Sequence, residues 1–416
     1  MFIINNYRKN ISLMFTISIV LMPILNSYVS PIRVLGLGEF LLILILPIML
    51  IYIIINNIRF YFSEYWLYII YGIFSTYFVV LLNKISFSEV NNRLFRNIFY
   101  AFIIFVLGQI FFDFELGSKI YKYVVLLACI FLILQLLSYI LFDVIIPWKL
   151  PGIDFNINIS MEEYFNKYKT SYRPTSFFTE PAHFVQYCTP YLAIILFKKI
   201  KLTKLDFMLS FFITIIILTS TSVNGFIFIL VIWGLWSFYN LFIYNKRKNA
   251  LFIFLSIYIL PIVLFGLYNF IDGFKTIIDR IVNITNDISS IIRLVNGFII
   301  FSQLDLLYKF IGIGFGSYDE FKELYPITLL HETKVEYMSS LSYLLVSSGI
   351  LGFIFYLLFM LLLFKRSNIL GKVLIILSFF MFFSSSIYSS PMFALLFVFV
   401  LSSKKNNSEY IIMDDK

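Results

Sequence analysis

The sequence predicts an all-α, polytopic membrane protein of about twelve transmembrane helices. Hydrophobic residues make up 61% of the 416 positions and charged residues only 13%, about half of the ~25% charge found in soluble domains. Apolar residues come in runs of roughly 17 to 25, the length that a helix needs to cross a bilayer. The period-two alternation that is typical of a transmembrane barrel does not occur in the sequence.

The predicted spans follow one another with short connections, apart from two long ones. They lie near residues 11–28, 37–55, 65–82, 95–112, 123–146, 182–198, 205–223, 225–243, 250–271, 337–364, 369–386 and 388–402. No small-residue cleavage site follows the first run, so we interpret it as a retained span rather than a signal peptide. Residues 1–402 are expected to form a single multispan domain, and residues 403–416 a polar cytoplasmic tail.

Basic residues alternate between successive connections and so predict an orientation. One set is rich in Lys and Arg, as in KKIKLTK at 198–204 and KRK at 246–248. The other set has only Arg33, Lys84, Arg93 and Arg96. By the positive-inside rule, both termini are then cytoplasmic, and the long connections at about 147–181 and 272–336 are extracytoplasmic. This asymmetry accounts for the net charge of +9, so we expect no nucleic-acid partner.

The sequence contains no recognisable metal or cofactor motif. Cys129 and Cys188 fall in or beside apolar helices, which favours neither a disulfide nor a metal site. The patterns HExxH, CxxC, GxSxG and the Walker loop are absent. We therefore expect a protein that needs no metal and no cofactor.

The segment SYRPTSFFTEPAHF, residues 171–184, gathers Arg173, Glu180 and His183 beside an apolar helix. Polar groups are costly near hydrocarbon unless they pair or contact water, so these three are candidate functional residues. Each also has a structural alternative. Arg173 could be a loop surface charge, and Glu180 could lie at the positive end of a helix that Thr179 caps. His183 could be a packed and hydrogen-bonded histidine.

The connection at 272–336 holds a second set of candidates. Apolar residues recur at helical spacing from Ile277 to Val295 and predict an amphipathic helix or helix pair at the membrane surface or the mouth of the bundle. Arg280 and Arg293 interrupt this pattern. A guanidinium presents a planar fork of donors that pairs with phosphate oxygens, so the two suit a diphosphate. The alternative is that both extend toward lipid headgroups.

Two features follow in the same connection. The run IGIGFGS, residues 311–317, has no predicted sheet around it, so we interpret its glycines as backbone that allows a tight approach. His331 stands just before a long span, where a histidine at a wet mouth suits a general base near neutral pH. Gly349 and Gly352 within that span are small residues at which helices can approach closely.

The order and spacing of these features resemble the Wzy-type polysaccharide repeat-unit polymerases and the related O-antigen ligases of bacteria. RPTSFFTEP, residues 173–181, is similar to the family's segment with Arg, small residues, Phe and then Glu-Pro or Asn-Pro. SSIIR, residues 289–293, followed by IGIGFGS, is similar to its arginine helix and Gly-x-Gly loop. His331 resembles its histidine before a GxxG span. The resemblance covers roughly residues 165–365, and Glu332 stands where the ligase-type pattern has Asn.

The resemblance implies a glycosyltransferase on the outer face of the bacterial cytoplasmic membrane. It would polymerise undecaprenyl-diphosphate-linked repeat units into O-antigen, capsular or exopolysaccharide. It assigns catalysis to His331, Arg173 and Arg293, and substrate binding to Arg280, Glu180 and His183. Diphosphate is already a good leaving group, so the residues need to stabilise phosphate charge and accept a proton rather than supply a strong acid.

The implied partners are the lipid-linked glycan donor and acceptor, the bilayer, a chain-length regulator and a flippase. Two alternatives remain at this point. A ligase would use the same residues to move finished glycan onto a final acceptor. A flippase for lipid-linked oligosaccharide would carry repeated halves and charged residues near mid-bilayer, and the sequence has neither.

Overall fold

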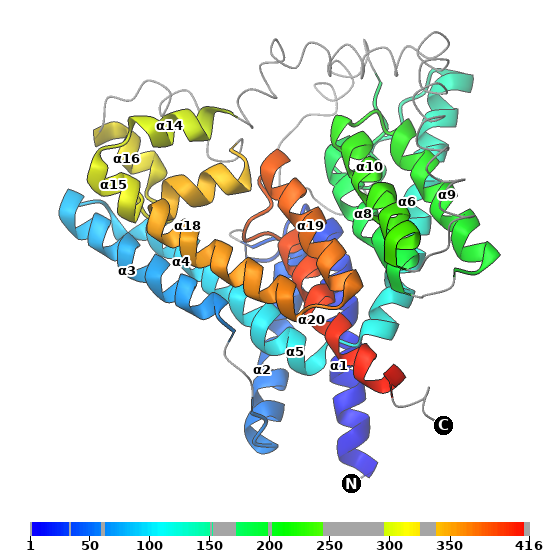
Figure 1. The fold of residues 1–416 in the computed structure, drawn as a ribbon, viewed down its shortest axis with the longest axis horizontal. Helices are drawn as coiled ribbons and strands as arrows, with labels where there is room; N and C mark the ends of the chain where they lie inside the picture. The colour runs from blue at the N-terminus through cyan, green and yellow to red at the C-terminus, as the bar shows by residue number, and fades with distance from the viewer. Residues whose placement is uncertain are drawn as a thin grey trace. The chain divides into compact units, whose positions relative to one another are not determined.

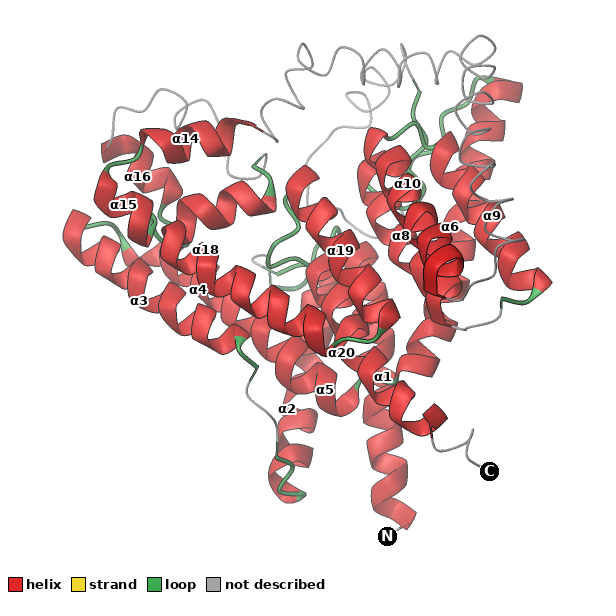
Figure 2. Ribbon diagram, viewed as in Figure 1, coloured by secondary structure: helices red, strands yellow, loops and turns green. Residues whose placement is uncertain are grey.

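The computed structural model describes residues 2–32, 35–59, 63–149, 152, 172–198, 202–243, 295–324 and 338–411. Within these ranges the chain is helical apart from loops and one isolated β-bridge between Val29 and Gly36 (Figure 2). The chain divides into two compact units. Their residues can be located in Figure 1, where the colour follows the residue number. Unit 1 comprises Met1–Ile11, Ile48–Phe112 and Ile284–Lys416, and unit 2 comprises Ser12–Pro47 and Asp113–Asn283.

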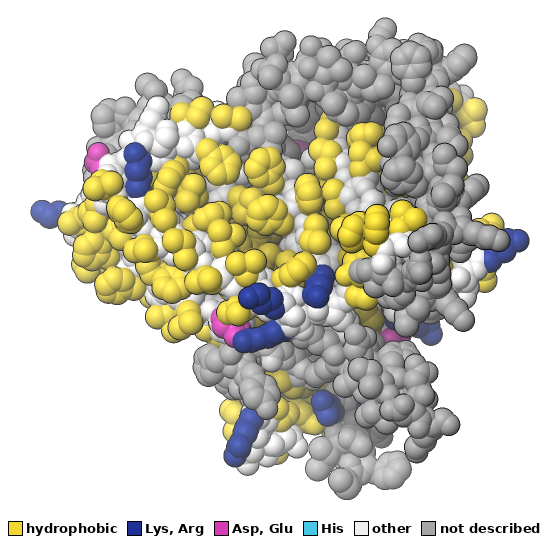
Figure 3. Space-filling model, in the orientation of Figure 1, with side chains coloured by type: hydrophobic (Ala, Val, Ile, Leu, Met, Phe, Trp, Pro, Cys, Tyr) yellow, Lys and Arg dark blue, Asp and Glu magenta, His cyan; other side chains and the backbone are white. Residues whose placement is uncertain are grey.

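Seven helices among the described residues are long and apolar enough to cross a membrane. They are Tyr7–Leu25, Leu37–Ile55, Tyr65–Asn83, Val90–Phe111, Phe114–Phe142, Val223–Phe242 and Ser340–Arg366. Their outward faces carry large hydrophobic side chains, such as Ile70, Phe74 and Leu81, and such side chains cover the described surface over α3 and α18 (Figure 3). Because lipid rather than water favours such a surface, the protein is an all-α polytopic membrane protein. The count of about twelve spans stays a prediction.

Four further helices occupy predicted span positions but are shorter or less apolar. They are α8 (Pro181–Lys198), α9 (Lys204–Thr219), α19 (Ile369–Ser384) and α20 (Pro391–Ile411). α8 is buried over most of its length and so tolerates polar residues that a lipid-facing helix would not. The span predicted at 250–271 lies outside the described residues.

Unit 2 is built around α8, which packs against α6 (Phe114–Phe142), α9 and α10 (Val223–Phe238). α10 continues into a π-helical turn, η2 (Tyr239–Ile243). Most of α1 (Phe2–Leu25) and the first part of α2 (Leu37–Ile55) belong to the same unit. Buried tyrosines join these helices, because Tyr121 of α6 donates to the carbonyl of Tyr187, and the Tyr187 hydroxyl donates to the Val20 carbonyl at 2.9 Å.

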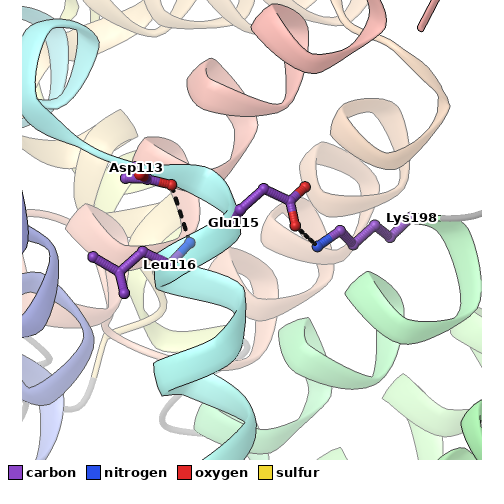
Figure 4. A network of polar contacts seen from close by, with 4 residues as sticks. All are labelled: Asp113, Glu115, Leu116 and Lys198. Carbon is purple, nitrogen blue, oxygen red and sulfur yellow. Dashed lines mark hydrogen bonds and ion pairs between the residues drawn. The ribbon is translucent and has the colours of Figure 1, made fainter.

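Charged residues define one end of unit 2. The Asp113 carboxylate caps α6 by accepting from the Leu116 amide at 3.0 Å, and Glu115 pairs with Lys198 at the end of α8 (Figure 4). Lys198 is the first residue of the KKIKLTK connection, which is predicted to be cytoplasmic. Acidic residues in the first turn and a basic residue in the last turn both complement the helix dipole. This end of the unit is therefore fixed by charge as well as by packing.

Unit 1 is built around α18 (Ser340–Arg366), which packs against α3 (Tyr65–Asn83) and α19. α4 (Phe87–Phe102) continues through a π-helical turn, η1 (Ile103–Leu107), into α5 (Gly108–Phe111). Aromatic rings fill the core between these helices and α20. They include Tyr65, Tyr68, Phe105, Tyr356, Phe359, Phe382, Phe393 and Phe397.

The described part of the late connection contains three short helices. It forms α14 (Gly297–Gln303), α15 (Leu306–Ile311) and α16 (Tyr318–Leu324), of which α14 and α15 pack against α18. The Tyr308 hydroxyl donates to Asn83 Oδ1 at 2.9 Å, which places α15 at the C-terminal end of α3. Residues 277–294, where the sequence predicts the amphipathic helix, lie outside the described residues.

Candidate functional site

The structure describes three of the six candidate site residues, and all three belong to unit 2. They are Arg173, Glu180 and His183, on the segment that leads into α8. The other three, Arg280, Arg293 and His331, lie outside the described residues. The geometry therefore bears on how the first part of the predicted site is built, while the convergence of all six stays a prediction.

A single buried glutamine holds the segment before α8. Gln135 of α6 accepts hydrogen bonds from the amides of Thr175 and Ser176 at 3.2 and 2.8 Å. Its amide nitrogen donates to the carbonyls of Ser176 and Ile146, both at 3.2 Å. The Ser176 hydroxyl donates to the Ala128 carbonyl of α6 at 2.7 Å. An irregular backbone inside a membrane protein must satisfy its polar groups in this way, so the segment is rigid rather than a free loop.

The small residues and the phenylalanines of RPTSFFTEP all contact the neighbouring helices. Thr175 and Ser176 are fully buried, and both bind to α6. Phe177 stacks on Phe131 of α6 with ring centroids 4.5 Å apart, and Phe178 packs on Tyr187 of α8 at 5.3 Å. The pattern of small residues followed by two aromatics therefore docks the segment between α6 and α8.

Arg173 connects this segment to the turn between α9 and α10. Its Nε donates to the Thr221 hydroxyl at 3.2 Å, and one Nη donates to the Thr221 carbonyl at 2.9 Å. Thr221 has a φ of 56°, a conformation that is strained for a β-branched residue and typical of functional sites. Arg173 is half-buried and oriented, which disfavours the interpretation that it is a mobile surface charge.

Glu180 and His183 lie at the start of α8, which begins at Pro181 as the sequence predicts. The Glu180 carbonyl accepts from the amides of His183 and Phe184 at 3.1 and 3.3 Å, which is the N-cap position. The Thr179 hydroxyl lies 2.8 Å from Nδ1 of the exposed His183. His183 is thus oriented by Thr179 and is not a packed core histidine. Glu180 has the helix-start role that was its structural alternative, but the prediction that Thr179 caps the helix is wrong, because Glu180 itself lies at the N-cap.

The glycine run of unit 1 makes the tight approach that the sequence predicts. Gly312, Gly314 and Gly316 have φ values of 82°, 91° and 82°, which glycine adopts at little cost. They lay the backbone across α18, where the amides of Ile313 and Gly314 donate to the carbonyls of Val346 and Ser347 at 3.0 and 2.9 Å.

α18 is broken at the point where this loop crosses it. Gly349 has a φ of 64° and a ψ of −174°, so the helix is interrupted and the carbonyls before the break are available to the loop. A Cβ on Gly312 would overlap the Ser347 carbonyl, and a Cβ on Gly349 would overlap the Phe310 carbonyl. Breaks of this kind occur in membrane helices only where protein or a wet cavity covers them.

Sequence reasoning missed a polar cavity in unit 1 that α4 lines with Arg93, Arg96 and Asn97. The predicted span began at residue 95, and both arginines were interpreted as connection charges. The helix in fact begins at Phe87. The signal was present, because the three residues follow the i, i+3, i+4 spacing that places side chains on one helical face.

The described residues define a polytopic α-helical membrane protein in which α6 holds the segment before α8 and α18 is broken at Gly349. No protein-family model matches the chain, and no curated protein matches it.

Proposed function

We propose that the protein is a polyprenyl-diphosphate-dependent glycosyltransferase that polymerises lipid-linked oligosaccharide repeat units. It would act on the outer face of a bacterial cytoplasmic membrane, with about twelve spans and both termini in the cytoplasm. The observation that carries the proposal is the fixed orientation of Arg173, a permanent charge held at the entry to α8 by two hydrogen bonds to Thr221. The resemblance of the segment to the Wzy-type pattern supports the same interpretation.

The reaction joins two lipid-linked glycans. A hydroxyl oxygen of the acceptor repeat unit attacks the anomeric carbon of the donor glycan, and the bond from that carbon to the diphosphate oxygen breaks. The hydroxyl proton passes to His331, and undecaprenyl diphosphate leaves with the electron pair. The product is a longer glycan on the acceptor carrier.

Each candidate residue has a chemical role in this step. Arg173 and Arg293 stabilise the negative charge that grows on the phosphate oxygens. His331 acts as the general base, a role that an imidazole can fill near neutral pH. Arg280, Glu180 and His183 bind substrate, and Glu180 and His183 already lie within one turn of each other at the start of α8.

Replacement of Arg173 by alanine in the native host tests the proposal. We expect long surface glycan chains to disappear while single repeat units on the lipid carrier accumulate at the outer face. Arg59→Ala, which removes an exposed arginine on the predicted cytoplasmic side, is the matched control and should leave chain length unchanged. Unaltered chain length in Arg173→Ala at equal protein level contradicts the proposal.

The same experiment separates the alternatives. Long carrier-linked chains that never reach a final acceptor would indicate a ligase. Repeat units trapped on the cytoplasmic face would indicate a flippase. Gel electrophoresis of surface glycans and mass spectrometry of lipid-linked intermediates distinguish the three outcomes.

A further inference from the structure

A cavity of about 190 Å³ opens in unit 1 between α4, the first part of α18 and the connection from α19 to α20. Its described lining includes Arg93, Arg96, Asn97, Tyr343, Tyr388 and Ser389. None of the described lining residues is acidic, so the electrostatic potential of this lining is positive. A single water needs only ~10–15 Å³, so the cavity admits a larger polar group.

The two arginines come from the polar face of α4. The Ser86 hydroxyl caps this helix, and Arg93 and Arg96 follow on one face. Both lie within Val90–Phe111, a stretch that is long and apolar enough to cross a membrane. Arginine in such a stretch is expensive and usually marks a substrate or ion site. For Arg93 the described residues include no ion-pair partner among the acidic side chains.

The opposite wall is fixed by Ser340, the first residue of α18. Its hydroxyl donates to the Ser385 carbonyl at 2.8 Å and accepts from the amides of Ile387 and Tyr388 at 2.7 and 3.0 Å. The next residue, Ser389, donates through its hydroxyl to the buried Asn97 of α4. The hydrogen bonds of Ser340 thus fix the backbone of the connection from α19 to α20, which carries Tyr388 and Ser389 into the cavity wall.

The glycine run forms the support behind the two tyrosines. Phe315 lies 6.0 Å from the Tyr388 ring and 6.2 Å from the Tyr343 ring, measured between centroids. The Tyr388 hydroxyl is 3.4 Å from that of Tyr65. A tyrosine hydroxyl keeps its proton at physiological pH, so Tyr388 can act as a donor. The cavity is thus lined by three segments, and the glycine run packs behind its two tyrosines.

We propose that this cavity binds a phosphate-type oxyanion, a phosphate or diphosphate group, through Arg93 and Arg96 with the Tyr343 and Tyr388 hydroxyls as further donors. Guanidinium groups bind such oxyanions through paired hydrogen bonds. Arginines that only extend toward headgroups would not explain why hydroxyls from two other segments converge on the same space. The assignment does not depend on the reaction proposed above, because it concerns binding and uses different residues.

The first test measures binding of inorganic diphosphate to the full-length protein in phospholipid-free detergent micelles. We expect diphosphate to raise the Tm of the wild type, since a ligand that binds only the folded state stabilises it. In the double variant Arg93→Gln/Arg96→Gln the apparent affinity should fall by about tenfold or more, the effect of losing ~1.4 kcal/mol. Arg59→Gln, a matched exposed arginine of unit 1, should behave like the wild type.

The second arm identifies the source of the phosphate group. The protein is placed in nanodiscs of phosphatidylcholine with or without phosphatidylglycerol, and native mass spectrometry counts retained phosphatidylglycerol. Arginine-dependent retention without a diphosphate response assigns the site to a lipid headgroup, whereas a diphosphate response in micelles assigns it to a diphosphate end group. Binding in either arm that the double variant loses supports the proposal.

A milder variant separates binding from misfolding. Tyr343→Phe keeps the half-buried ring and removes only the hydroxyl, so it should fold like the wild type and bind diphosphate more weakly. Equal binding by the wild type and the double variant in both arms, or no binding in either, overturns the proposal.

Discussion

Arg173 and Thr221 lie 48 positions apart in the sequence, and the guanidinium of the first donates to both the side-chain and the backbone oxygen of the second. The pair ties the entry segment of α8 to the turn between α9 and α10. Because the Arg173 guanidinium makes two hydrogen bonds to one residue, its orientation is fixed as well as its position. Pre-orientation of this kind is what the proposed stabilisation of a diphosphate requires.

The first prediction separates a structural from a functional role for Arg173. Thr221→Ala removes one acceptor, and Arg173→Lys keeps the charge but loses the planar fork. Each should lower stability, by about 1 kcal/mol for Thr221→Ala and about 1–3 kcal/mol for Arg173→Lys. We expect glycan polymerisation to fall much further in Arg173→Lys than in Thr221→Ala. Activity that simply follows the Tm in both variants would show that Arg173 is only a structural connection.

The second prediction concerns Gln135, which binds four backbone groups of the entry region. Gln135→Leu has a similar volume but leaves these groups unpaired inside the protein. The expected loss of stability is on the order of 3–5 kcal/mol, because each unsatisfied buried group costs about 1–3 kcal/mol. Thermal unfolding in detergent measures it. Gln303→Leu, at an exposed position, is the control. A Gln135→Leu protein as stable as that control would show that the hydrogen bonds of Gln135 do not hold the segment before α8.

The third prediction tests the crossing of the glycine run over α18. Gly312→Ala forces a side chain into a conformation that only glycine adopts readily and into overlap with the Ser347 carbonyl. The two effects together cost on the order of 2–6 kcal/mol. Gly234 of α10 provides the control, because a Cβ added there meets nothing within 4 Å. Gly234→Ala should therefore be neutral or stabilising by about 0.5–1 kcal/mol. Equal Tm changes for the two variants would exclude the crossing.

The fourth prediction tests the orientation in the membrane. Cys129 and Cys188 are both buried, so the native chain should react little with a maleimide that cannot cross membranes. Ser88→Cys, in the first turn of α4, should react in intact cells, whereas Asn56→Cys, just after α2, should react only after permeabilisation. Both positions are exposed and belong to unit 1. The reverse pattern would place the late helical connection in the cytoplasm and remove the proposed reaction.

Hydropathy was sufficient to predict much of the fold. The boundaries of α2 and α3 were predicted to within one residue, because apolar runs that face lipid have abrupt ends. α4 was placed too late, since a polar face lining a cavity resembles a connection when only hydropathy is considered. The break at Gly349 was expected only as a place of close helix approach, and a broken helix depends on the distant loop that satisfies its carbonyls.

The candidate site was predicted less completely, for a physical reason. Arg173 could be singled out because charge beside an apolar run is unusual, and Pro181 marked the start of α8. Gln135 could not be linked to the segment that it holds, since nothing local in an apolar helix indicates which distant backbone its amide will bind. The same reason applies to Ser340, which acts on residues 45 to 48 positions away.

The most direct measurement is elongation by the purified protein in proteoliposomes that contain the host's own undecaprenyl-diphosphate-linked repeat unit. We expect a ladder of glycans with release of undecaprenyl diphosphate, lost in Arg173→Ala and retained in Arg59→Ala. If the wild type leaves the repeat unit unchanged, or if Arg173→Ala elongates it as fast as the wild type, the proposed function is wrong.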